Sequence, residues 1–468
     1  MLTKNSKLDI PADDPFDNDK LERKVIAENL TYLVQSTNQP FVISIEAPWG
    51  WGKTTFIEMW KAYLEQQGHT CLYFNAWEND FVEDPLIAFI GEIEKAIGEK
   101  NAKGNLEKRL NTLQDIGGKI LRKTLPFAVQ LATQGILSQE NVKQASEFLS
   151  SSSDEIAKFS SEIATERIRQ YEKDKQGIKD FKKELGEFAK EISEVEGNKA
   201  PLVFFVDELD RCRPDFGIAL LERIKHIFNA EGIIFVLGID REQIEQSVKS
   251  IYGQEMKPDG YLRRFIDYGV RLPEPKINSY CDYLFRRFRF DEVFSAKQIN
   301  NEKNTFLKIL ILLIESYSMS LRAVEQIFTE LNVILRTMQN SSIHLSLLAF
   351  LVVTKNYKKQ DYLRIKDGLS YDEIKSLIVD LGEKFTEDDD YLTEWFLAYL
   401  ETYFVMYLPE KERMIAKESL LAKSNSEDDN SRHAKKVLEN FSTVRHVRGS
   451  YVVRNLIQKM DLVDILSL

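Results

Sequence analysis

Cysteine and histidine are scarce in this chain of 468 residues, which contains three cysteines and five histidines. Cys71, Cys212 and Cys281 lie far apart, and no two of them form the Cys-x-x-Cys pair that opens most zinc sites. The histidines are scattered without metal-ligand spacing. The sequence therefore predicts neither a zinc site nor a disulfide framework, and it favours a reducing compartment.

Long hydrophobic runs are also missing. The apolar stretch Thr124–Ser138 is shorter than the roughly 18 to 20 residues that span a bilayer, and it contains Gln130 and Gln134. The N-terminal segment lacks the apolar centre of a secretory signal. We therefore expect a cytoplasmic protein.

Positive charge is in deficit, because 63 lysines and arginines face 74 acidic residues and leave a net charge of -11. This balance disfavours a general attraction to nucleic acid or anionic lipid. Basic residues nevertheless cluster ahead of the apolar stretch, at Lys100, Lys103, Lys108, Arg109, Lys119, Arg122 and Lys123. They fit a solvated face beside a core helix better than a membrane-surface helix, but peripheral contact with the inner membrane face stays open. Arginines interleaved with phenylalanines over residues 285–290 leave nucleic-acid contact open in the same way, with a solvated helix face favoured.

Short apolar runs alternate with amphipathic helical segments in two parts of the chain. The runs predict buried strands at Phe41–Ile45, Thr70–Phe74, Leu202–Val206 and Ile233–Ile239. Helical spacing predicts helices at Leu21–Val34, Thr55–Gln66 and about 216–229. Alternation of this kind is typical of an α/β fold with a doubly wound parallel sheet.

The length exceeds what one hydrophobic core usually supports, so we expect several domains. The predicted strands assign residues 13–100 and 200–275 to a discontinuous α/β core. Residues 101–199 form an insertion whose apolar spacing predicts long helices packed like a coiled coil. An all-helical C-terminal domain is expected over 276–422, and the polar tract Lys423–His433 leads to terminal helices over 434–468.

A glycine-rich loop lies between the first predicted strand and the next helix. It reads Ala47-Pro48-Trp49-Gly50-Trp51-Gly52-Lys53-Thr54 and is followed by Thr55. This is a Walker A pattern, with Ala47 where the first glycine usually stands. Its glycines allow backbone amides to surround phosphates at a helix N-terminus, Lys53 would reach the β- and γ-phosphates, and Thr54 would bind Mg²⁺. The alternative is an ordinary strand–turn–helix connection.

Acidic residues follow the strand Leu202–Val206. Asp207 at its carboxyl end is expected to hold Mg²⁺ through water, and Glu208 to polarise the attacking water. Asp210 would stabilise the loop or share the metal role. The alternative is a solvated acidic turn. No Asn-Lys-x-Asp segment for guanine follows, so ATP with Mg²⁺ is the expected ligand pair.

Several segments together resemble the KAP family of P-loop NTPases. They are Trp49–Thr54, Phe74–Trp77, Val206–Cys212, Phe235–Asp240, Tyr261–Phe265 and Leu272–Pro273. The resemblance covers about residues 13 to 275, and Ser320–Glu325 extends it to about residue 355. Many members carry transmembrane helices between the two Walker elements, where this chain has its insertion. Bacterial relatives are associated with exclusion of phage, so the resemblance implies a role in antiviral defence.

The resemblance also implies roles for three further positions. Asp240 looks like a sensor beside the γ-phosphate. Arg263 or Arg264, just before a return strand over 268–272, looks like an arginine finger acting on a neighbouring subunit. Arg322 is a candidate second sensor. For Arg263 and Arg264, surface pairing with Glu255 or Asp267 is an equally good interpretation.

Two hypotheses for the function follow. In the first, the chain is an ATPase that drives conformational switching or assembly; its catalytic residues are Lys53, Glu208, Asp210, Arg264 and Asp240. In the second, it is a nucleotide-gated scaffold that hydrolyses little and recruits a protein partner or a membrane through its helical insertion. A homo-oligomer is expected under the first hypothesis, because an arginine finger acts between subunits.

Overall fold

The computed structural model of the chain describes residues 9–37, 39–82, 84–99, 105–122, 175–195, 197, 199–225, 227, 229–338, 344–385, 390–425, 429–444 and 449–466. The chain divides into two compact units, Leu8–Pro273 and Glu274–Leu468.

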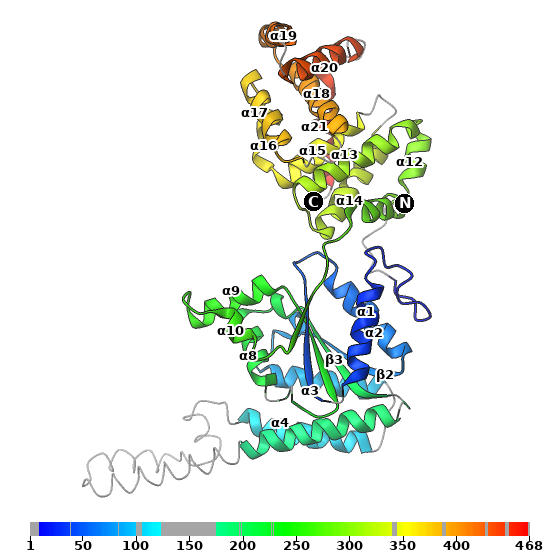
Figure 1. Ribbon diagram of the computed structural model, residues 1–468, viewed down its shortest axis with the longest axis vertical. Coiled ribbons are helices and arrows are strands. Elements are labelled where there is room, and N and C mark those ends of the chain that lie inside the picture. Colours follow the sequence, from blue (N-terminus) through cyan, green and yellow to red (C-terminus); the bar gives the residue numbers. More distant parts are fainter. Residues whose placement is uncertain are drawn as a thin grey trace, which may run out of the picture. The chain divides into compact units, whose positions relative to one another are not determined.

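The first unit is built on a sheet of five parallel strands in the order β2-β3-β4-β1-β5 (Figure 1). The strands are β1 (Phe41–Glu46), β2 (His69–Asn75), β3 (Lys199–Asp207), β4 (Ile233–Ile239) and β5 (Tyr268–Arg271). Each predicted strand is present, and the α/β fold is confirmed. Because all five are parallel, their carboxyl ends lie along one edge of the sheet.

Helices cover both faces of this sheet. One face carries α1 (Lys24–Ser36) and α2 (Lys53–Gln66); the other carries α3 (Pro85–Glu99), α4 (Asn105–Arg122), a helix over residues 175–195, α8 (Pro214–Lys225), α9 (Arg241–Tyr252) and α10 (Pro258–Leu262). Short 3-10 turns follow β2 and β3 at η1 (Trp77–Asn79) and η2 (Leu209–Arg211).

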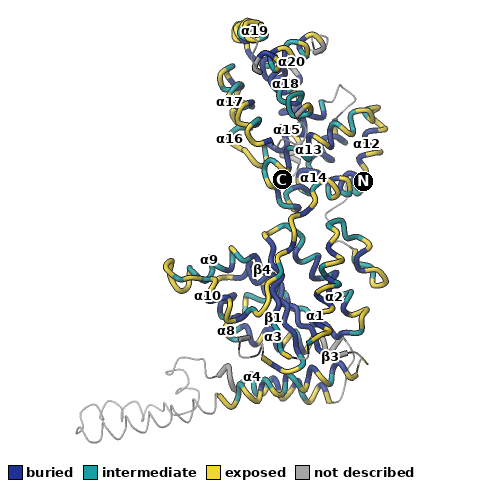
Figure 2. The backbone as a smooth tube through the Cα atoms, viewed as in Figure 1, coloured by how far each residue is buried: buried dark blue, intermediate teal, exposed yellow. Residues whose placement is uncertain are grey.

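Neighbouring residues of a strand point to opposite faces, so β1, β2, β3 and β4 each contribute to two cores. Phe204 and Phe235 lie in the core with α3 and α8, whereas Phe205 and Val236 lie in the core with α1 and α2. Both cores exclude solvent, and β1 and β4 appear as buried segments in Figure 2, whereas β5 is mostly exposed. Runs that are apolar at every position are required by this two-sided burial.

The described part of the insertion packs on the sheet unit. Leu110 of α4 and Leu185 and Phe188 of the helix over 175–195 belong to the same core as Phe89 of α3. Arg109 forms ion pairs with three glutamates of the second helix, Glu184 at 3.0 Å, Glu187 at 3.6 Å and Glu191. One member of the predicted basic cluster is therefore neutralised within the chain.

Other parts of the insertion are not among the described residues. Lys100, Lys103, Lys123 and the apolar stretch 124–138 lie outside the described residues. Within the part that is described, no helix is both long enough and apolar enough to cross a bilayer. The three cysteines are free and buried.

The second unit is helical throughout its described residues. Its elements are α11 (Ile277–Arg287), α12 (Phe290–Ala296), η3 (Asn300–Glu302), α13 (Lys303–Ser316), α14 (Leu321–Thr337), α15 (Leu345–Tyr357), α16 (Lys359–Asp367), α17 (Tyr371–Gly382), α18 (Asp390–Tyr407), α19 (Glu410–Ser424), α20 (Asp429–Val444) and α21 (Gly449–Leu466). A single core joins them, and α15 is buried along most of its length. Helix α20 begins inside the polar tract 423–433, and its Val437 lies in this core.

The arginine- and phenylalanine-rich segment 285–290 lies in this second unit. Phe285, Phe288 and Phe290 are buried in the core, so their rings offer no surface on which a nucleic-acid base could stack. Arg287 forms an ion pair with Glu325 at 2.7 Å.

Candidate functional site

The glycine-rich loop joins β1 to α2 at the carboxyl edge of the sheet. Gly50 and Gly52 have positive φ angles of 79° and 77°, a conformation that costs glycine little and other residues more. The amide of Ala47 donates to the carbonyl of Ile239 at 3.2 Å, which fixes the start of the loop to the end of β4. Ala47 is buried, so its methyl group fits where the usual pattern has glycine.

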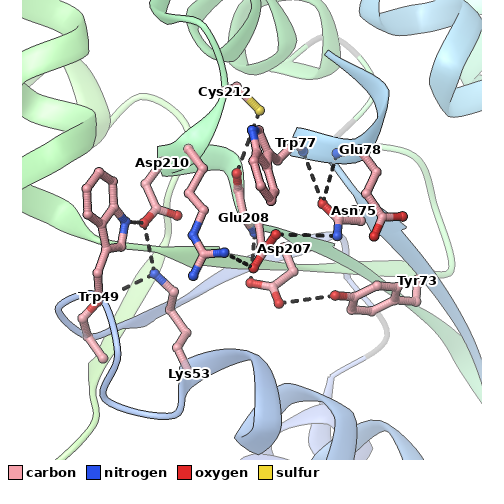
Figure 3. Close-up of polar contacts among 12 residues, drawn as sticks. Trp49, Lys53, Tyr73, Asn75, Trp77, Glu78, Asp207, Glu208, Asp210 and Cys212 are labelled. Atoms are coloured by element: carbon pink, nitrogen blue, oxygen red, sulfur yellow. Dashed lines mark hydrogen bonds and ion pairs between the residues drawn. The ribbon is translucent and has the colours of Figure 1, made fainter. Parts of the chain in front are cut away.

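Lys53 is the first residue of α2, and its ammonium group is held inside the site. It is 7% exposed and donates to Asp210 Oδ2 at 3.1 Å and to the carbonyl of Ala47 at 3.4 Å. Trp49 Nε1 donates to the same oxygen of Asp210, and Figure 3 shows Trp49 and Lys53 converging on that carboxylate. The ammonium group that was predicted to bind phosphate is thus paired with a carboxylate of the chain itself.

Asp207 lies at the end of β3 and is fully buried. Its carboxylate accepts hydrogen bonds from the Glu208 amide at 2.8 Å, from the Tyr73 hydroxyl at 3.2 Å and from the side chain of Thr54. Burial raises the pKa of Asp207 to about 6, although the Glu208 amide, the Thr54 hydroxyl and the charge of Lys53 oppose this shift. Its carboxylate therefore lacks full charge compensation.

A magnesium ion fits these residues. Mg²⁺ prefers oxygen ligands, takes few of them from the protein and keeps several waters and phosphate oxygens. The hydroxyl of Thr54 and the undercompensated carboxylate of Asp207 are hydrogen-bonded to each other and supply two such oxygens. Among the described residues no group of three or more His, Cys, Asp or Glu side chains is placed to hold a metal ion.

Glu208 follows Asp207 in a left-handed backbone conformation, with a φ angle of 57°. Its Oε1 forms an ion pair with Arg211 at 2.6 Å, and its Oε2 accepts from Asn75 Nδ2 at 3.4 Å. Asn75 Oδ1 in turn accepts the amides of Trp77 and Glu78, which anchors it at the end of β2. The unusual φ angle marks Glu208 as a residue whose position is imposed by its surroundings.

Asp240 lies directly after β4, which is placed between the strand of the loop and the strand of Asp207. Its Oδ2 accepts the Trp49 amide at 3.0 Å, so it contacts the loop directly. It is 7% exposed, and burial raises its pKa. The strand order thus brings Asp240 between the glycine-rich loop after β1 and the acidic residues after β3.

The candidate arginines lie elsewhere. Arg263 ends α10, is exposed and pairs with Asp259 at 2.9 Å. Arg263 does pair on the surface, but its partner is Asp259 and not the predicted Glu255 or Asp267. The carboxylate of Asp267 accepts the Val42 amide instead. Arg264 is also exposed. Arg322 belongs to α14 of the second unit and is exposed, and Thr55 lies half-buried in the first turn of α2.

Three contributors to the site were not predicted from the sequence. Gly238 on β4 leaves space for the Asp207 carboxylate, since a Cβ there would lie 2.3 Å from Asp207 Oδ1. Tyr73 and Asn75 on β2 hold Asp207 and Glu208. The glycine inside an apolar strand was a usable signal, because such a glycine often marks a close approach. Asn75 belongs to the segment Phe74–Trp77 that carries the family resemblance, but no role was assigned to it, and nothing in the local pattern marks Tyr73.

An open hollow of about 430 Å³ lies beside the loop. Its wall includes the indoles of Trp49 and Trp77, each about half exposed, together with Asp210 and the amide side chains of Gln243 and Gln246. Aromatic walls with a few polar groups suit a small organic group.

Comparison with known protein families supports this geometry. The model of the KAP family P-loop domain matches residues 23–338, which is more than half of the chain. No curated protein matches the chain at a significant level. The matched residues include the glycine-rich loop, the acidic residues after β3 and the whole sheet. The chain therefore belongs to the KAP family of P-loop NTPases.

Proposed function

We propose that the chain binds ATP with Mg²⁺ at the loop Ala47–Thr54 and hydrolyses it. One observation carries this proposal: Lys53, Thr54, Asp207 and Glu208, which come from two distant segments, meet at the carboxyl ends of parallel strands. This edge is where open α/β sheets bind their ligands.

The residues of the site would divide the work. The loop amides and Lys53 would bind the phosphates, which requires Lys53 to exchange the Asp210 carboxylate for a phosphate oxygen. Thr54 and Asp207 would hold Mg²⁺, which neutralises charge on the β- and γ-phosphates when bound. Glu208 would orient and polarise the water that attacks in line, and Asp240 would keep the Trp49 end of the loop in place.

Replacement of Glu208 by glutamine tests hydrolysis. Glu208→Gln keeps the size of the side chain and removes its basicity, so steady-state phosphate release should fall about 100-fold or more, while ATP affinity stays within about threefold of wild type because the loop is intact. Glu65→Gln, on the exposed side of α2, is the control and should leave both unchanged. Equal turnover in wild type and Glu208→Gln would disprove the proposed role of Glu208 in activating water.

A nucleotide-gated scaffold is the second candidate function, and the pairing of the catalytic groups favours it. In the structure Lys53 is bound to Asp210, and Glu208 is bound to Arg211. Both contacts must be exchanged before catalysis, so turnover can be slow even when binding is tight. Nucleotide binding without Glu208-dependent phosphate release would select this function.

We also propose the wider setting that the family implies. The chain would act in the cytoplasm as a homo-oligomer in which Arg264 of one copy reaches the nucleotide of the next, and it would recruit a protein partner or a membrane through the insertion. Measurement of particle mass with and without nucleotide tests the assembly. A role in anti-phage defence predicts that plaque formation on cells with the chain rises when Lys53 is replaced by alanine.

A further inference from the structure

A buried arginine lies against the glycine-rich loop. Arg23 immediately precedes α1 and is 2% exposed. Its Nη1 donates to the carbonyl of Trp51 at 2.7 Å and to that of Gly52 at 3.4 Å, and its Nη2 donates to the carbonyl of Pro273 at 3.1 Å. One side chain thus joins two loop peptides to the last residue of the sheet unit, which is 250 residues away in sequence.

The two loop bonds help to set where the loop amides point, together with the bond from the Phe56 amide to the Gly52 carbonyl at 3.0 Å. In a trans peptide the N–H is directed opposite to the C=O. Because the carbonyls of Trp51 and Gly52 face Arg23, the amides of Gly52 and Lys53 face the other side of the loop. Backbone amides at the start of the α2 helix are the donors that a P-loop offers to phosphates.

The charge of Arg23 lacks a direct counterion. Among the described residues no carboxylate forms an ion pair with it, and its Nε has no hydrogen-bond partner there. Asp19 is the acidic residue whose charge acts on Arg23, but its carboxylate accepts hydrogen bonds from the backbone amides of Leu21, Arg23 and Lys24. Burial lowers the pKa of Arg23 to about 10, although Asp19 opposes this. A buried cation in this state is stabilised by an anion placed nearby.

We propose that Arg23 is a positioning residue that ties the phosphate loop to the Pro273 carbonyl, and that bound polyphosphate tightens this tie. The inference rests on the proposed nucleotide binding. An anion on the amide side of the two loop peptides makes their carbonyls stronger acceptors and supplies the negative charge that the guanidinium lacks. The backbone at Pro273, where the sheet unit ends, then responds to nucleotide occupancy.

Hydrogen exchange of the full chain tests this proposal, with a non-hydrolysable ATP analogue and Mg²⁺ as the probe. Amides of the loop 47–54 and of Leu272 and Glu274, which flank Pro273, should exchange about tenfold more slowly with the analogue, the effect of one hydrogen bond to a charged group. In Arg23→Lys, which keeps the charge but cannot span three carbonyls, saturating analogue should still protect the loop and no longer protect Leu272 and Glu274.

The control is Arg336→Lys in the second unit, where Arg336 also donates to a backbone carbonyl, that of Phe288 at 3.2 Å. It should respond like wild type. Protection of the wild-type loop without protection beside Pro273 overturns the inference but leaves nucleotide binding standing, and so does an Arg23→Lys chain that keeps both protections. No protection of the wild-type loop overturns nucleotide binding itself, and the inference with it. The wild-type comparison decides even where the Arg23→Lys chain fails to fold.

Discussion

Asp207 shows how a single buried carboxylate links stability to pH. Its pKa is raised from 3.8 to about 6 by burial, so the folded state holds a proton on this group where the unfolded state has lost it. Between about pH 4 and pH 6 the folded state therefore binds more protons than the unfolded state, and stability falls as the pH rises through this range. At about 1.4 kcal/mol per pKa unit the loss is about 3 kcal/mol.

The variant Asp207→Asn removes this titration. Without nucleotide or Mg²⁺, the wild type should lose about 3 kcal/mol of stability between about pH 4 and pH 7 through this group, and the variant should not. The free energy of unfolding of the variant minus that of wild type should therefore increase by about 3 kcal/mol over this range. Urea denaturation at several pH values measures the difference. Asp215→Asn, at an exposed position of α8, is the control and should follow wild type. Parallel pH curves for wild type and Asp207→Asn would disprove the raised pKa.

Residue identities were predictable from the sequence where they belong to a local motif. Lys53 and Thr54 directly follow the glycines of the Walker A pattern, and Asp207 and Glu208 directly follow an apolar strand. Arg23 contacts partners that are 28 and 250 residues away in sequence. The partner of Tyr73 is 134 residues away, and that of Asn75 is 133 residues away. Such contacts depend on the order of the strands in the sheet and on side-chain conformations. The hydrophobic periodicity of the sequence specifies neither.

Strand β4 is the element that assembles the site. It separates β1 from β3, so the loop and Asp207 are not on adjacent strands, and the carboxylate of Asp207 lies over Gly238. The strands and their parallel direction were predictable because two-sided burial leaves continuous apolar runs. Their order was not, because each of these strands carries much the same apolar signal.

Replacement of Gly238 by alanine should disturb both the proposed metal site and the packing of α2. The added Cβ would lie 2.3 Å from Asp207 Oδ1 and 2.6 Å from Ile57 Cδ1, so one or both must move. We expect a loss of about 1 to 3 kcal/mol in the free energy of unfolding and a higher Mg²⁺ concentration for half-maximal nucleotide binding. Denaturant titration and Mg²⁺ titration measure the two effects.

Gly91→Ala is the matched control, because a Cβ at this position in α3 meets no atom within 4 Å. Alanine should stabilise that helix by up to about 1 kcal/mol. If Gly238→Ala is no less stable than wild type and needs no more Mg²⁺, the Asp207 carboxylate does not lie as close to β4 as the structure shows.

The whole molecule consists of two units with separate cores. The core of Glu274–Leu468 shares no residue with the two cores that pack on the sheet. The sequence predicted a helical C-terminal part, and the described residues of this part are helical. The insertion was also predicted to be helical, yet its association with α3 depends on long-range packing and could not be foreseen.

Calorimetry should therefore resolve two unfolding transitions. Under the proposed function, ATP with Mg²⁺ would bind only the sheet unit, so it should raise one midpoint and leave the other within about 1 °C. At 100 times the dissociation constant the stabilisation is about 2.7 kcal/mol. A single transition, or an equal shift of both, would show that the units unfold together.

Nucleotide binding by Lys53 is the central claim, and titration of the chain with a fluorescent ATP analogue in the presence of Mg²⁺ tests it most directly. Lys53→Ala removes the buried ammonium group of the loop, whereas Lys61→Ala removes a more exposed lysine from the same helix. We predict that wild type and Lys61→Ala bind equally and that Lys53→Ala binds about 10- to 100-fold more weakly, the effect of one charge-assisted hydrogen bond. Equal binding by Lys53→Ala, or no binding by wild type, would contradict the claim.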